Sequence, residues 1–367
     1  MTADQAARDR IAHDRSATLF VEAGAGAGKT TSLVARIVGL VTDGIDITSI
    51  AAITFTEKAA GELRQRLRRA LAEHSLDDAL DRLDHAPIGT LHAFARRILN
   101  EYPVAAGLPP GFAVLDELES QLRFDERFEL LVDRLLADPS PTDPLDGGAR
   151  LVELCKRDTF NLTKGLRRVA DDFQKNWDLV AERVALDPPP PWEPDPAPAL
   201  AAARAVISYG PDVPVDDRAA DHVANVAAAA AELDAAASFT ATLDALELLA
   251  DAAHRGIRGG AVGKWKSGAG AGALESLRDA HRATEQAALE QLTAARQHRK
   301  ALVGAILGRW VLDGAAERAR DGLLEFHDLL VIARRLVHEH TEARRALHAR
   351  YQRVLLDEFQ DTDPLQL

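Results

Sequence analysis

The sequence predicts an α/β fold in which a parallel sheet is interrupted by a large helical insertion. Two observations support this. Short apolar runs followed by helix-period patterns lie near the N-terminus, and another apolar run that ends in acidic residues lies near the C-terminus. Between them, most of the 367-residue chain carries helix-period leucines and alanine tracts. We therefore expect one domain made of residues 1–105 plus 321–367, and an inserted helical subdomain of residues 106–320.

Three apolar runs and two helix-period stretches define the expected α/β domain. Each run is short and bounded by polar or glycine-rich residues, as buried parallel strands are. Each of the first two runs is followed by a stretch with apolar residues on one face, which is typical of a helix that covers a sheet. The expected strands are Ser16–Glu22, Ser49–Phe55 and Arg353–Leu356, and the expected helices are Thr30–Val41 and Glu57–Leu71.

The middle region is expected to be helical with two interruptions. Asp187–Pro198 is too rich in proline for a helix or a central strand, and it predicts an extended linker or surface loop. Gly256–Ala273 is rich in glycine and alanine, which favours a flexible loop. The stretches expected to form helices are Asp116–Ala137, Leu162–Val184, Asp221–Ala253 and Leu274–Val311.

Composition favours a cytoplasmic protein without a membrane partner. There is no run of about 18 apolar residues, and the N-terminus lacks the apolar core of a signal peptide. A single cysteine, Cys155, excludes a disulfide scaffold and a cysteine-based metal site. The net charge of -13 argues weakly against nucleic acid, but the acidic excess lies mainly in residues 106–320, with 34 acidic and 25 basic side chains. The charge distribution therefore still allows a local basic face outside residues 106–320.

The stretch AGAGAGKTT predicts a phosphate-binding loop. Small residues let backbone N–H groups approach an anion, a lysine reaches the β- and γ-phosphates, and the following hydroxyl suits Mg²⁺. The strict pattern opens with glycine, where this chain has Ala23. Two other glycine-rich stretches, Gly259–Trp265 and Gly268–Ala273, lack this combination and are expected to be loops. The expected ATP contacts are Ala23, Gly24, Ala25, Gly26, Ala27, Gly28, Lys29, Thr30 and Thr31.

A second motif, VLLDEFQDTDP at Val354–Pro364, predicts the acidic half of the site. An apolar strand would deliver Asp357 to its carboxyl end, where ligands of parallel sheets bind. Mg²⁺ prefers one or two carboxylates together with phosphates and waters, so we expect Asp357 and Thr30 to serve the metal. The next residue, Glu358, is expected to orient and deprotonate an attacking water.

Together, AGAGAGKTT and DEFQDT resemble the UvrD/Rep/RecB-like group of superfamily 1A DNA helicases. Three more stretches are similar to motifs of that group: AITFTEKAA at 52–60, GTLHAF at 89–94, and EFHDLL at 325–330, where His327 replaces an Asp. The resemblance implies a RecA-like ATP-binding domain that uses MgATP. It also implies that Gln360 acts beside Glu358 and Lys29 in catalysis, and that Gln5 reads the adenine, with an ordinary surface glutamine as the alternative.

The resemblance further implies a single-stranded DNA track along two of these motifs. Phe55 would stack on a base, with a role as a core aromatic as the alternative; for His92 a structural role is the alternative. Four arginines between residues 64 and 69 would either steer phosphates or form a solvated helix face. The expected DNA contacts are Thr54, Phe55, Thr56, Lys58, Thr90 and His92.

As a member of this group, the chain would couple ATP hydrolysis to 3′-to-5′ movement on DNA in repair or recombination. Its long insertion is nearer to RecB- and AddA-like members. The downstream helicase motifs are not in the sequence, so we expect half a motor that a C-terminal motor domain or a partner subunit completes. Two alternatives remain open: a nucleotide- and DNA-binding subunit without motor activity, and a P-loop ATPase that acts on RNA or on a protein partner.

Overall fold

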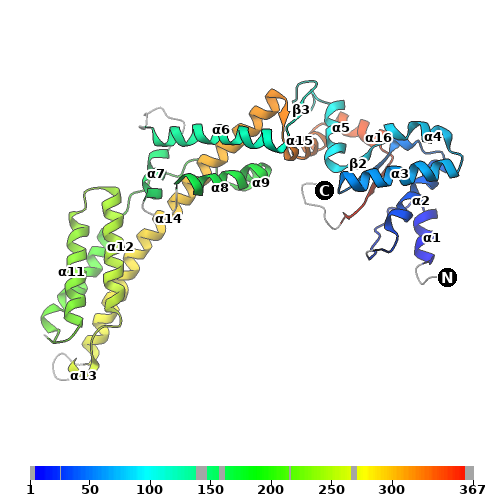
Figure 1. Cartoon of the computed structure of the whole chain (residues 1–367). Helices are drawn as coiled ribbons and strands as arrows, with labels where there is room; N and C mark the ends of the chain where they lie inside the picture. Colours follow the sequence, from blue (N-terminus) through cyan, green and yellow to red (C-terminus); the bar gives the residue numbers. More distant parts are fainter. Residues whose placement is uncertain are drawn as a thin grey trace. The chain divides into compact units, whose positions relative to one another are not determined.

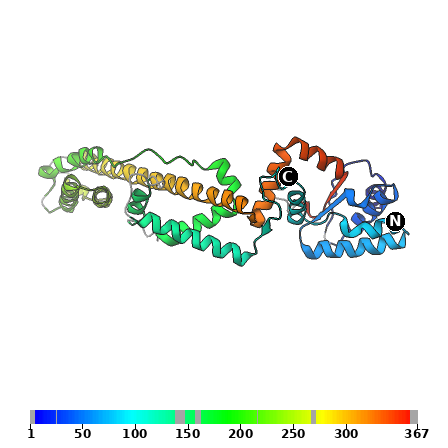
Figure 2. The same cartoon turned by 90° about the horizontal axis from the view of Figure 1, so that it is seen from above.

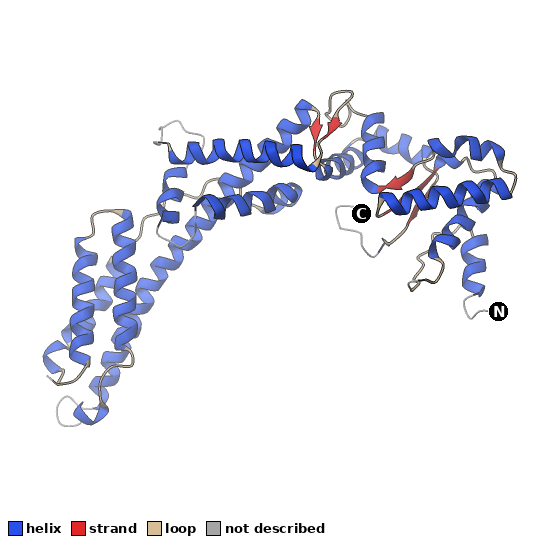
Figure 3. Cartoon of the chain, in the orientation of Figure 1, coloured by secondary structure: helices blue, strands red, loops and turns tan. Residues whose placement is uncertain are grey.

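The computed structural model describes residues 5–24, 26–137, 147–156, 162–214, 216–265 and 271–359. Helices dominate these residues, and strands are few (Figure 3). The chain divides into two compact units: unit 1 consists of residues 1–122 and 314–367, and unit 2 of residues 123–313. The observed fold is therefore a mostly helical α/β architecture with a parallel sheet.

The sheet of unit 1 has three parallel strands in the order β2-β1-β5. They are β1 (Ile50–Thr54), β2 (Ile88–Thr90) and β5 (Arg353–Leu356). Figure 1 labels β2 together with the helices α3 (Glu57–Glu73) and α5 (Leu91–Glu101) of this unit. The central strand β1 is buried at all five positions, as an apolar run covered on both faces should be. The predicted strands over residues 49–55 and 353–356 are thus confirmed, and residues some 300 positions apart in the chain pair in register, with Ile53 opposite Leu356.

Helices cover both faces of this sheet. The predicted helices are confirmed as α2 (Lys29–Thr42) and α3 (Glu57–Glu73), and Leu63, Leu67 and Leu71 of α3 are buried with the apolar side chains of α2 and β1. A second core cluster joins α5 and α15. The other helices of unit 1 are α1 (Gln5–His13), α4 (Asp77–Arg82), α5 (Leu91–Glu101), α15 (Phe326–Glu339) and α16 (Thr341–Arg350). Short connectors complete it: η1 (Ile47–Ser49), η2 (Leu83–His85) and a two-residue parallel ladder of β3 (Ala113–Val114) and β4 (Leu323–Leu324).

The predicted strand over Ser16–Glu22 is wrong. The chain there is irregular, and the ring of Phe20 is 78% exposed. An apolar run forms a buried strand only where a neighbouring strand takes its hydrogen bonds and a helix covers its face. Here the carbonyl of Ala17 instead accepts a hydrogen bond from the guanidinium of Arg36 on α2, at 3.0 Å. The edge-to-face contact of Phe20 with Phe359, with ring centroids 6.0 Å apart, leaves most of the Phe20 ring in solvent.

Unit 2 is built of helices around its own apolar core. The predicted stretches at 116–137 and 274–311 are helical, and the second extends to a helix of 51 residues, coloured yellow to orange in Figure 2. The other two stretches each break into two helices: Ser238 caps a new helix by accepting from the amide of Ala241 at 3.2 Å, and Asn176 separates another pair. The helices are α6 (Glu117–Leu136), α7 (Gly148–Lys156), α8 (Leu162–Lys175), α9 (Trp177–Arg183), α10 (Ala197–Ser208), α11 (Ala219–Ala235), α12 (Phe239–Gly256), α13 (Val262–Trp265) and α14 (Ala271–Asp321), with η3 (Gly210–Asp212) between α10 and α11.

Of the two predicted interruptions of unit 2, the proline-rich one is irregular as predicted and the glycine-rich one is partly helical. The proline-rich segment is irregular up to Pro196, but Trp192 packs edge-to-face on Phe239, with centroids 6.1 Å apart. In the glycine-rich segment, the indole of Trp265 is 1% exposed and its Nε1 donates to Asp217 at 3.2 Å. An aromatic ring packs in each segment. The predicted loop at 256–273 is confirmed over residues 257–261, whereas Val262–Trp265 form a short helix and residues 266–270 lie outside the described residues.

Among the described residues, no helix combines the length and the apolar character needed to cross a bilayer.

Candidate nucleotide-binding and DNA-binding site

The carboxyl ends of the three strands form one edge of the sheet, and the predicted site residues follow them. Thr54 ends β1, Thr90 ends β2, and Asp357 comes directly after β5. The amide of Asp357 donates to the carbonyl of Ile53 at 2.9 Å, which extends the β1–β5 ladder by one hydrogen bond. This bond holds the first acidic residue beside the end of β1, at the edge where parallel sheets bind ligands.

A glycine-rich loop, here Gly24 together with residues 26–28, precedes α2 at this edge. Gly26 and Gly28 have φ angles of 77° and 83°, a left-handed conformation that L side chains rarely adopt. Apart from chain neighbours, no described atom lies within 4 Å of where a Cβ would stand on Gly24 or Gly26. In the described part of the chain, space is therefore open beside these two glycines at the N-terminus of a 14-residue helix, whose partial positive charge favours an anion; we call this space the cradle.

Lys29 and Glu358 meet at this cradle although 329 positions separate them in the chain. The Nζ of Lys29 lies 3.1 Å from Oε1 and 3.0 Å from Oε2 of Glu358. Their side chains are 30% and 36% exposed, so solvent screens the pair and its contribution to stability is small. Glu358 has a φ of 55°, and its amide donates to Oδ1 of Asp357 at 3.1 Å. In this turn the Glu358 carboxylate contacts Lys29, whereas the Asp357 carboxylate accepts from the Glu358 amide.

The remaining predicted nucleotide contacts are close to Lys29 in the sequence. Thr30 and Thr31 are the second and third residues of α2, in the turn that begins with Lys29. Ala23 precedes the loop. Two predicted residues, Ala25 and Gln360, lie outside the described residues.

Helix α1 lies against the loop through an arginine that the sequence reasoning missed. Nη2 of Arg8 donates to the carbonyl of Ala27 at 2.7 Å. Gln5, one turn earlier on the same helix, donates from Nε2 to Asp9 at 3.0 Å. The only sequence signal was the spacing of Arg8 from Gln5, because residues three apart share a helix face.

The predicted DNA contacts divide into exposed and buried side chains. Phe55 is 62% exposed, so the alternative of a core aromatic does not fit, and Thr56 and Lys58 are exposed beside it. Thr54 and Thr90 are buried. Their hydroxyl groups form internal hydrogen bonds, Thr54 to the carbonyl of Thr56 at 3.1 Å and Thr90 to the carboxylate of Glu57 at 2.9 Å.

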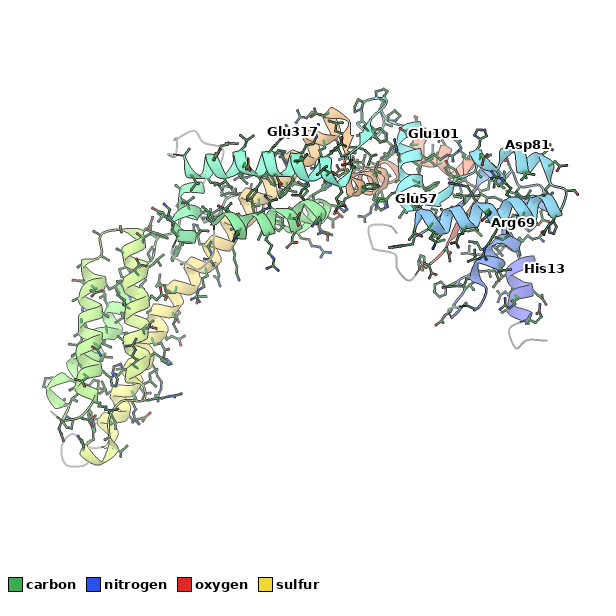
Figure 4. The ribbon with its side chains drawn as sticks, in the orientation of Figure 1. His13, Glu57, Arg69, Asp81, Glu101 and Glu317 are labelled. Atoms are coloured by element: carbon green, nitrogen blue, oxygen red, sulfur yellow. The ribbon has the colours of Figure 1, made fainter. Side chains whose placement is uncertain are left out.

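Glu57 is the first residue of α3, at the helix end nearest β2 and α5 (Figure 4). Its bond to Thr90 joins the segments that follow β1 and β2. Thr56 and Thr90 also cap α3 and α5, since each hydroxyl accepts from a backbone amide of the first helical turn. These threonines therefore shape the surface on which Phe55 is exposed.

His92 is half-buried at the start of α5. Burial lowers the pKa of its imidazole, and the charge of nearby His327 lowers it further. The ring packs edge-to-face on Phe326, with centroids 5.6 Å apart. The lowered pKa favours the uncharged imidazole, which offers hydrogen bonding and ring contacts rather than a cation.

The arginines of α3 are partly engaged within the protein. Arg64 donates to the carbonyl of Ile88, and Arg68 pairs with Asp84 at 2.7 Å. Arg69 lies farther along the helix than Glu57 (Figure 4). These contacts leave less of the predicted basic face for phosphates than the sequence suggests.

The EFHDLL stretch has a structural role that its sequence did not reveal. The carboxylate of Asp328, 1% exposed, accepts two hydrogen bonds from Arg318, at 2.7 and 2.9 Å. It also accepts from the amide of Glu325, as part of a capping box at the start of α15. Burial alone would lower the pKa of Arg318, but the hydrogen bond and charge of Asp328 raise it, which favours the charged guanidinium.

The chain belongs to the family of the UvrD/REP helicase N-terminal domain, whose model matches residues 3–367. It is similar to an ATP-dependent helicase/nuclease subunit of Desulforamulus reducens, 42% identical over 136 residues, or 34% of this chain and 11% of that protein. The corresponding protein of Heliobacterium modesticaldum is 32% identical over 211 residues, covering 49% of this chain and 15% of that protein. Exonuclease/helicase subunit RexA of Lactococcus lactis is 36% identical over 159 residues, 40% of this chain and 13% of that protein. The chain thus spans at most 15% of the length of these relatives.

Proposed function

We propose that this chain is the ATP-binding and ATP-hydrolysing half of a DNA helicase that moves 3′-to-5′ on single-stranded DNA. The observation that carries the proposal is the Lys29–Glu358 contact at 3.0 Å, beside a positive-φ glycine loop and at the carboxyl edge of a parallel sheet. In this proposal residues 1–105 and 321–367 form a RecA-like motor domain, and residues 106–320 form its inserted helical subdomain. Membership in the helicase family supports the same assignment.

The nucleotide would lie in the cradle before α2. Backbone N–H groups of the loop and the helix N-terminus would bind the phosphates, and the ammonium of Lys29 would move from Glu358 to the β- and γ-phosphates. We propose Gln5 for the adenine, because its amide can both donate to and accept from the base edge. The proposed contacts are those expected from the sequence: Gln5 and residues 23–31.

By their oxygen chemistry, the side chains of Thr30 and Asp357 would suit a magnesium ion bound together with the phosphates. The hydroxyl of Thr30 and the carboxylate of Asp357 would hold the ion, as is usual where phosphates supply the other ligands. Bound Mg²⁺ neutralises negative charge on the phosphates. Glu358, turned away from Asp357 by its left-handed backbone, would orient a water and accept its proton, with Gln360 beside it.

DNA would cross the exposed surface after β1 and β2. Phe55 would stack on a base, and Thr56, Lys58 and His92 would contact the strand near it. Thr54 and Thr90 would act through the backbone turns that their hydroxyl groups hold. The Thr90–Glu57 hydrogen bond supports treating these two segments as one surface.

Partners follow from family membership and from the relatives' names. Those relatives are named as subunits of helicase/nucleases, and we propose that this chain likewise works with a second motor domain or a partner subunit. DNA repair or recombination is the proposed setting.

The direct test measures MgATP binding, ATP hydrolysis and strand displacement by the purified 367-residue chain. We expect the chain to bind MgATP, to hydrolyse it very slowly and not to displace a strand of a tailed duplex. In this proposal the arginine that completes the ATP site comes from a neighbouring domain, and such an arginine contributes about 10³–10⁵ to the rate of phosphoryl transfer. Failure to bind MgATP would refute the nucleotide site, and robust unwinding by the chain alone would refute the half-motor. Hydrolysis that responds to RNA but not to single-stranded DNA would instead favour the RNA-dependent ATPase.

Phe55→Ala is expected to weaken single-stranded DNA binding by about 1–3 kcal/mol, the contribution of one base stacked on an aromatic ring. Since the ring is 62% exposed, the melting temperature should change little. Fluorescence anisotropy with a labelled oligonucleotide measures the affinity, and Phe20→Ala, which removes another exposed ring, is the matched control. If both variants lose the same DNA affinity, or neither loses any, Phe55 does not contribute to DNA binding by stacking.

A further inference from the structure

We infer that Arg8 of α1 is a positioning residue for the phosphates of the bound nucleotide: it holds the Ala27–Gly28 peptide so that the Gly28 N–H faces the anion. This inference rests on the proposed ATP site and adds a residue that lies outside the glycine-rich motif. Its basis is the 2.7 Å hydrogen bond from Nη2 of Arg8 to the carbonyl oxygen of Ala27.

The geometry of the peptide links the two groups. A trans peptide is planar, so its C=O and N–H point in opposite directions. When Arg8 holds the carbonyl oxygen of Ala27, the N–H of Gly28 in the same peptide must point away from Arg8. Gly28 adopts a φ of 83° and immediately precedes Lys29. A loop that binds an anion needs this N–H turned inward, and a freely rotating Ala27–Gly28 peptide would present the repelling carbonyl instead.

Arg8 also fits closely against the loop. Its Nη1 lies 3.3 Å from where a Cβ on Gly28 would stand, so glycine at this position makes room for the guanidinium as well as for the left-handed backbone. The guanidinium is half-buried, and a charge-assisted hydrogen bond to a carbonyl is stronger than a neutral one. The positive charge of Arg8 near the loop favours a bound anion, as does the partial positive charge at the N-terminus of α2.

Gln5 lies on the same helix as Arg8. An experiment can therefore distinguish a role of Arg8 in tethering α1 from a role in orienting the loop. If Arg8 only tethered α1, its loss would release Gln5 and weaken the contact with the base. If Arg8 orients the loop, its loss would weaken the contact with the phosphates. An inorganic polyphosphate has no base, so it responds to the second role alone.

The experiment titrates ATP and inorganic tripolyphosphate, each with Mg²⁺, into the 367-residue chain by calorimetry. Arg8→Ala is expected to weaken both ligands by about ten-fold, the effect of one lost charge-assisted hydrogen bond. Arg8→Lys should recover much of the loss, because an ammonium can still donate to the Ala27 carbonyl. Arg10→Ala removes the same charge from an exposed position of α1 and should bind both ligands like the parent. Gln5→Ala should weaken ATP and leave tripolyphosphate unchanged.

Two outcomes would overturn the inference while leaving the proposed function intact. One is unchanged affinity of Arg8→Ala for both ligands, and the other is a loss confined to ATP, which would make Arg8 a tether for α1. A parent chain that binds neither ligand would refute the proposed nucleotide site itself, and the inference with it.

Discussion

Lys29→Ala is expected to abolish MgATP binding by the chain or to weaken it severely. The lysine is the cation that a phosphate-binding loop directs at the β- and γ-phosphates, and alanine leaves this charge unreplaced. The substitution also removes the contact of Glu358 with Lys29, but both side chains are about a third exposed, so water can solvate the carboxylate there. We therefore expect the melting temperature to change little while the affinity for MgATP falls severely.

Calorimetric titration of MgATP gives the affinity, and thermal melting followed by circular dichroism checks the fold. Lys156→Ala, which removes an exposed lysine of unit 2, is the charge-matched control and should bind like the parent. Parent-like affinity of Lys29→Ala in a folded protein would show that the loop does not bind phosphates.

Glu358→Gln is expected to retain nucleotide binding and to slow hydrolysis by about 10²–10⁴, the usual contribution of a positioned general base. The amide keeps the size of the side chain but cannot accept the proton of the attacking water. It also removes the anion that contacts Lys29 at 3.0 Å, so the ammonium meets less competition for the phosphates and binding should not weaken.

Single-turnover hydrolysis of labelled ATP gives this rate even where turnover is slow. Glu62→Gln, an exposed carboxylate on α3, is the matched control and should leave the rate unchanged. If Glu358→Gln hydrolyses ATP as fast as the parent, another group must orient the water.

Local patterns predicted the elements of unit 1 wherever the surroundings agreed with them. The helix that starts at Lys29 and the strand before Phe55 formed as predicted, because apolar periodicity and burial coincide there. The apolar run after Ser16 has the same composition as a strand, yet in the described residues it has neither a pairing strand nor a covering layer. Whether an apolar run becomes a strand depends on neighbours that are distant in sequence, and a single sequence does not reveal them.

The candidate site was predictable in its long-range outline and not in its local contacts. Parallel strands expose their carboxyl ends at one edge of a sheet, which predicts that Asp357 and Glu358 lie near the glycine-rich loop. The structure places Glu358 against Lys29. The burial of Thr54 was not predictable, because its hydroxyl turns to the carbonyl of Thr56 only in the folded turn. The contact of Arg8 with Ala27 depends on how α1 lies against the loop, and the spacing of Arg8 from Gln5 gives only the shared helix face. The roles of these residues in binding and catalysis stay predictions.

The attachment of α1 has a consequence for how the protein opens. This helix has nine residues and buries none of them, and a helix so short is marginal by itself in water. Polar bonds hold it instead: Arg36 of α2 donates to the carbonyls of Ile11 and Asp14 at 2.8 and 3.0 Å, although burial lowers the pKa of this guanidinium. Local unfolding free energies are lowest where few apolar contacts resist opening. Helix α1 is therefore expected to detach at a low free-energy cost, and the affinity of a ligand that contacts it would include the free energy of closing it. If Gln5 of α1 binds the adenine as proposed, part of the affinity for adenine nucleotides would in this sense be conformational, set by how much of the time α1 is folded before the ligand arrives.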